Sequence, residues 1–99
     1  MKVIITEPAW ESYAQALNFL SGYMTDRELE RWDKKLWDNI DDLKKWPRRG
    51  QYEPWLEYKG EGHRRLVVGK FKVIYRIGSR AIYIMDIFDA RQDPRKMKG

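Results

Sequence analysis

The sequence contains no cysteine and only one histidine, His63. Disulfide bonds and thiol chemistry are therefore excluded, and so are ordinary zinc and iron–sulfur sites, because these need several Cys or His ligands. We expect no metal ion and no other cofactor. Any catalysis has to use carboxylates, Lys, Arg, Tyr or the one histidine.

Long apolar runs are absent as well. None approaches the roughly 20 residues that cross a bilayer, and the apolar start of the chain is too short for a signal peptide. We therefore expect a cytoplasmic protein that does not associate with membranes. The 99 residues, of which 42% are hydrophobic and 35% charged, predict a single globular domain over residues 1–99.

Positive charge is in excess, with a formal net charge of +5. Such a charge favours an anionic partner, either nucleic acid or an acidic protein segment. The place of the cations in the fold therefore matters more than their sum.

Two helices are predicted after a short first strand at residues 2–6. Thr6 caps the first helix, which has a proline in its first turn, and Thr25 with Glu28 three residues later forms a capping box for the second. We expect Glu30 to pair with Lys34 on the outer face of the second helix. Apolar residues at steps of three and four give each helix one apolar face: Trp10, Tyr13, Ala14, Leu17, Leu20 and Met24, then Leu29, Trp32, Leu36, Ile40 and Leu43.

Three strands are predicted in the C-terminal third, at residues 64–68, 71–77 and 81–88, joined by turns that suit antiparallel hairpins. Residues 48–62 read as a loop with a short strand near residues 55–58. The element order predicts an α+β fold. In it the N-terminal strand and a three-stranded antiparallel meander form one antiparallel sheet, with the helical hairpin packed on one face.

Alternation along the strands assigns Phe71, Val73, Tyr75 and Ile77 to the face under the helices, with Ile82, Ile84 and Phe88 from the last strand. The other face then mixes cations with open apolar side chains, as binding surfaces do: Arg65, Lys72, Arg76 and Arg91, with Met85 and Ile87. In an alternative interpretation Met85 and Ile87 pack under the 48–62 loop, and the cations form a solvated rim. One bulge within residues 81–91 would move Arg91 to the other face.

The chain resembles the RelE/ParE family of toxins from bacterial type II toxin-antitoxin systems. The resemblance covers nearly the whole chain. Its most specific parts are the stretch from His63 to Ile77 (HRRLVVGKFKVIYRI) and the stretch from Ile84 to Pro94 (IMDIFDARQDP). A basic residue, a glycine, an aromatic, a second basic residue and an apolar pair before tyrosine are typical of the family's central hairpin, and an arginine typically closes the last strand.

The resemblance implies one of two activities. RelE-like members cut messenger RNA on the ribosome, whereas ParE-like members poison DNA gyrase without being nucleases. Both are neutralised by an antitoxin whose C-terminal segment wraps the toxin. The implied partners are therefore a cognate antitoxin and either ribosome-bound mRNA or DNA gyrase, with no membrane and no small-molecule cofactor.

Metal-free RNA cleavage needs a base, an acid and cations around the phosphate. The resemblance places Lys72, where the family usually has arginine, and Arg91 on the phosphate, with Glu53 of a Glu-Pro pair as the base. No Tyr or His follows Arg91 in residues 92–99, which we expect to form a mobile basic tail. Protons would then have to be carried by His63 or by a tyrosine: Tyr52, Tyr58 or Tyr83.

As a binding protein, the chain would contact the antitoxin or nucleic acid through the remaining residues of this region: His63, Arg64, Arg65, Arg76, Met85 and Ile87. The missing terminal Tyr or His favours ParE-like over RelE-like action. A further hypothesis is a non-toxic interaction protein that keeps only the antitoxin-binding surface, because a lysine at position 72 lacks the bidentate grip of arginine on phosphate.

Overall fold

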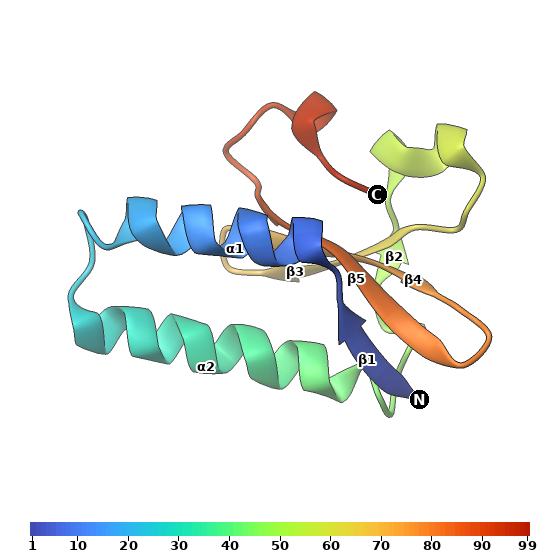
Figure 1. The fold of residues 1–99 in the computed structure, drawn as a ribbon, viewed down its shortest axis with the longest axis horizontal. Helices are drawn as coiled ribbons and strands as arrows, with labels where there is room; N and C mark the ends of the chain where they lie inside the picture. The colour runs from blue at the N-terminus through green and yellow to red at the C-terminus, as the bar shows by residue number, and fades with distance from the viewer.

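The computed structural model describes residues 1–99. One strand precedes a helical hairpin, and the remaining strands follow it (Figure 1). The elements in chain order are β1 (Lys2–Ile5), α1 (Glu7–Leu20), α2 (Asp26–Asp42), β2 (Gln51–Tyr52), the 3₁₀ helix η1 (Pro54–Lys59), β3 (Arg64–Val68), β4 (Phe71–Ile77), β5 (Ala81–Asp89) and the 3₁₀ helix η2 (Pro94–Lys96).

The strands form one sheet in the order β1-β5-β4-β3-β2. The predicted antiparallel meander is confirmed over β3, β4 and β5. β1, however, pairs with β5 in parallel, with Val3 opposite Ile82, so the sheet is mixed and not wholly antiparallel. Nearly the whole chain separates these two strands, and no hairpin therefore fixes their relative direction.

Both helices begin where the sequence predicts. The Thr6 hydroxyl accepts a hydrogen bond from the Ala9 backbone N–H at 3.4 Å, and Thr25 and Glu28 form the reciprocal capping box. The predicted short strand at residues 55–58 is wrong. Glu53 instead caps the 3₁₀ helix η1, and Pro54 at its start has no N–H to donate to a strand.

The helices cover one face of the sheet, with α1 over β5 and α2 over β3. None of the helices is long and apolar enough to cross a membrane. The main core lies between the helices and the sheet and contains Ala9, Tyr13, Leu36, Ile40, Leu43, Leu66, Val68, Phe71, Val73, Tyr75, Ile82, Ile84 and Ile87.

A β-bulge in β5 changes which side chains face the helices. Ile74 lies opposite Asp86, but Tyr75 lies opposite Ile84, so Met85 is an extra residue without a partner. Alternation resumes one residue out of step after the bulge. Ile87 is therefore buried in the main core and not exposed on the other face, as strict alternation predicted.

The opposite face of the sheet is also partly covered. Leu56 of η1 and Met97 pack there on Ile74 and Phe88, and Met85 lies against this minor core. Figure 1 shows η1 and the C-terminal segment side by side on this part of the molecule. Phe88 thus belongs to the minor core and not to the helix side. Residues 92–99, predicted as a mobile tail, make defined contacts, including a 2.9 Å hydrogen bond from the Lys98 backbone N–H to Asp86.

Candidate functional site

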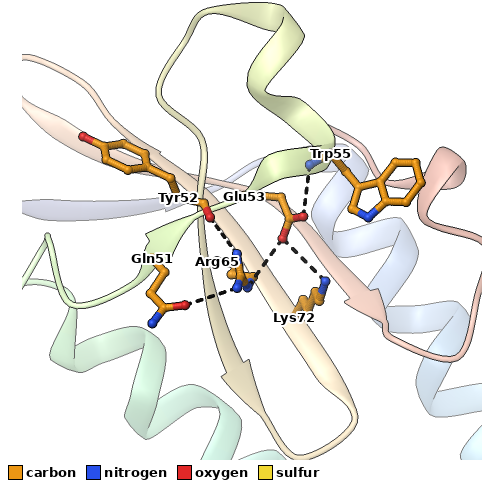
Figure 2. A network of polar contacts seen from close by, with 6 residues as sticks. All are labelled: Gln51, Tyr52, Glu53, Trp55, Arg65 and Lys72. Atoms are coloured by element: carbon orange, nitrogen blue, oxygen red, sulfur yellow. Dashed lines mark hydrogen bonds and ion pairs between the residues drawn. The ribbon is translucent and has the colours of Figure 1, made fainter.

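Glu53 is the centre of a polar cluster on the sheet face away from the helices (Figure 2). Its carboxylate oxygen Oε2 lies 3.5 Å from Lys72 Nζ and 3.8 Å from Arg65 Nε, while Oε1 accepts a hydrogen bond from the Trp55 backbone N–H at 3.3 Å. The Glu53 side chain is 0% exposed. The structure therefore brings Glu53 together with Lys72, beside which the resemblance placed it, and with Arg65, which alternation put on the face of Lys72.

The chain places these three groups through three different elements. Glu53 follows β2 and begins η1, Arg65 lies in β3, and Lys72 lies in β4. Arg65 also donates to the Tyr52 carbonyl at 2.6 Å and to the Gln51 side chain at 3.2 Å, so its guanidinium is tied to β2 (Figure 2). The cluster joins the edge of the sheet to η1.

Arg91 does not belong to this cluster. The bulge carries the end of β5 to the helix side, and the Arg91 guanidinium lies over the Phe19 ring of α1, 5.3 Å from its centroid. Arg91 Nε donates to Asp89 Oδ1 at 2.9 Å. This hydrogen bond lowers the pKa of Asp89 and raises that of Arg91. The prediction that Arg91 shares a face with Lys72 is wrong.

Arg91 instead lines a pocket of about 590 Å³ at the turn end of the helical hairpin, where α1 ends and the connection to α2 begins. Lys70, from the turn between β3 and β4, supplies a second cation. Neighbouring Gly69 has a positive φ of 58°, and a Cβ there would lie 2.1 Å from the Trp32 ring, so only glycine allows this approach. The apolar lining consists of Phe19, Leu20, Tyr23, Met24, Trp32 and Phe71.

The other predicted contact residues are less accessible than strand alternation indicated. His63 is 2% exposed, and neither ring nitrogen has a hydrogen-bond partner. Burial lowers its pKa, which keeps the ring neutral. Met85 is half-buried and Ile87 is fully buried, so neither offers open apolar surface beside Lys72.

Two of the predicted cations have structural partners. Arg64 donates to the Gly50 carbonyl at 2.7 Å and lies over the Tyr52 ring, and it therefore holds the segment before β2. Arg76 lies 3.8 Å from the Glu61 carboxylate and over the Tyr83 ring. Each remains partly exposed.

Sequence reasoning missed Asp89 and Lys70 as members of a site. The sequence does carry a signal for Asp89: it lies two residues before Arg91, and the same spacing joins Asp93 to Arg95 in a second ion pair. The pocket itself has no local sequence signal. It depends on where the hairpin end meets the turn between β3 and β4.

One comparison with known proteins gives a match. A family model described as "ParE toxin of type II toxin-antitoxin system, parDE" matches residues 3–94 of the chain. No curated protein matches it.

Proposed function

Because the chain belongs to the ParE toxin family of type II toxin-antitoxin systems, we propose that it inhibits growth by poisoning DNA gyrase and that a cognate antitoxin neutralises it. The observation that carries this choice over mRNA cleavage is the separation of Lys72 from Arg91. They lie on opposite sides of the sheet, one beside Glu53 and the other against Phe19.

RNA cleavage requires several groups around one phosphate, and their arrangement argues against a nuclease. Base, acid and cations must reach the same reacting atoms. Arg91 is on the wrong side for a phosphate held by Lys72, and the Glu53 carboxylate is covered and already paired with two cations. His63 is buried away from solvent. The chain therefore acts through its surface and not through bond cleavage.

The antitoxin, in this proposal, contacts the sheet face around Arg65 and Lys72. Both side chains are 24% exposed and carry positive charge toward solvent. Val67 lies directly opposite Lys72 and is 62% exposed, and Trp55 beside Glu53 is 53% exposed. Cations next to open apolar side chains suit an acidic segment with apolar anchors.

The gyrase contact, in turn, is assigned to the pocket of Arg91 and Lys70. An apolar pocket with a few fixed polar groups is the usual form of a binding site. The two surfaces lie on opposite sides of the sheet, so neutralisation and target binding use different residues.

Expression in a bacterial host tests the proposal. We expect growth arrest with accumulated DNA breaks, relieved when the protein encoded beside the chain is co-expressed and found to co-purify with it. Truncated ribosome-associated transcripts without DNA breaks would instead establish RelE-like cleavage. Strong expression without arrest, in a chain that still binds its neighbour, would favour the non-toxic interaction protein.

A further inference from the structure

A second hollow lies between α1 and α2, on a surface that no strand residue lines. It has a volume of about 700 Å³. Its apolar part is built on aromatic rings in contact: the Trp10 centroid lies 5.3 Å from that of Trp37 in a tilted arrangement, and the Tyr13 ring meets Trp37 edge-on, also at 5.3 Å. Trp10 is 49% exposed. The Trp37 ring packs against both of these rings and also borders the open surface of the groove.

Three carboxylates of α2 border the same groove: Asp26, Glu30 and Asp33. Their spacing puts them on one face of the helix. Glu30 does not form the predicted pair with Lys34, which binds Asp38 at 2.7 Å instead. None of the three takes part in any ion pair of the structure, and no Lys or Arg lines the groove. The groove is thus locally acidic in a chain of net charge +5.

We propose that this groove docks a basic amphipathic helix of a partner protein. An apolar stripe would lie on Trp10, Leu17 and Trp37, as helix-in-groove recognition requires. Lys or Arg beside the stripe would meet Asp26 and Glu30, and cations also bind the faces of Trp rings. Two helices running side by side (Figure 1) would become three, which buries the exposed indole.

The charge of the groove separates this partner from those already considered. Carboxylates repel both nucleic acid phosphates and an acidic antitoxin segment, whereas Arg65, Lys72, Lys70 and Arg91 attract them. The inference does not depend on how growth is inhibited. It depends only on residues of the helical hairpin.

The test uses the full chain and two synthetic amphipathic helical peptides, one built from Leu, Ala and Lys and a matched one with Glu in place of Lys. Indole N–H signals are followed by NMR, with those of Trp46 and Trp55 as references outside the groove. We expect the Lys peptide to shift Trp10 and Trp37 only, to bind less tightly at about 0.5 M salt, and to bind at least about tenfold more tightly than the Glu peptide.

Glu30→Lys is expected to lower the affinity for the Lys peptide at least about tenfold. The matched control is Glu57→Lys, because Glu57 is also an exposed acid but lies on η1, outside the groove; it should leave the affinity unchanged. Equal loss in both variants, or shifts centred on Trp55, would overturn the proposal. The proposal would also be overturned if the wild type were a dimer in size-exclusion chromatography and Trp10→Ala were a monomer. The groove would then be occupied by a second copy of the chain.

Discussion

Lys72 and Arg91 lie on opposite sides of the sheet, although strict alternation would put them on the same one. Lys72 pairs with Glu53 at 3.5 Å, and Arg91 lies over Phe19. The cause is one extra residue, Met85, in β5. This arrangement separates the proposed antitoxin surface from the proposed gyrase surface, and each surface can be tested independently of the other.

Arg91→Ala is expected to relieve growth arrest while binding to the antitoxin persists. The reason is that Arg91 lines the proposed gyrase pocket and is remote from Arg65 and Lys72. Growth curves and co-purification measure the two properties. Arg95→Ala is the matched control, because Arg95 forms the same kind of ion pair with Asp93 but is 81% exposed outside the pocket. Equal relief by both variants would show that loss of positive charge, and not the pocket, matters.

Ile87→Ala should lower the free energy of unfolding by about 2 to 5 kcal/mol, the range for truncating a buried aliphatic side chain. Ile87 is 1% exposed and belongs to the main core. Val67→Ala, at a site that is 62% exposed, should change the free energy of unfolding by less than about 0.5 kcal/mol. Urea denaturation of both variants checks the bulge: similar small effects would mean that Ile87 faces solvent.

Tyr75→Phe should destabilise the protein by about 1 to 3 kcal/mol, because it leaves buried polar groups without a partner. The Tyr75 hydroxyl accepts from the Gly50 backbone N–H and donates to the Pro47 carbonyl, both at 2.8 Å. Burial raises its pKa, so it stays protonated. Thermal unfolding should show a clear loss for this variant and almost none for Tyr83→Phe, whose hydroxyl makes no hydrogen bond within the protein; equal effects would refute this role.

Stability should fall as the pH drops below about 6.5, the ordinary pKa of histidine. Burial lowers the pKa of His63, with Lys59 and Arg76 acting in the same direction and Glu61 opposing them. The unfolded chain therefore binds the proton more readily than the folded one, and stability present above this pH is lost below it. Asp89, whose pKa Arg91 lowers, titrates at lower pH and does not contribute here.

His63→Gln removes this titration. Its unfolding free energy, measured by urea denaturation between about pH 7 and pH 5, should decline less steeply than that of the wild type. Parallel declines would mean that another group dominates in this range.

Most of the fold could be predicted because it follows from local signals. Capping residues set the starts of both helices, and β3 and β4 have the predicted bounds. The direction of β1 could not be predicted, because it depends on pairing between strands at opposite ends of the chain. The 3₁₀ helix η1 could not be predicted either, because it depends on how Glu53 folds back over the sheet.

The site was only half predictable. Arg65 and Lys72 share a face because regular alternation holds in β3 and β4, whereas only the family resemblance placed Glu53 with Lys72. Alternation fails at Met85, and every residue after it in β5 changes side. A bulge has no reliable sequence signal, because it reflects how β5 fits its neighbours. The burial of His63 beneath η1 and the C-terminal residues has the same origin in packing between distant segments.

The most direct test mixes the purified protein with DNA gyrase, supercoiled plasmid and ATP, in the wild type and in Glu53→Gln. We expect trapped DNA cleavage with both proteins, because Glu53 serves as an ion-pair partner and not as a base. A control reaction with mRNA on ribosomes should show no cleavage. Gyrase poisoning is contradicted if no DNA cleavage appears while the wild type cuts the mRNA and Glu53→Gln does not.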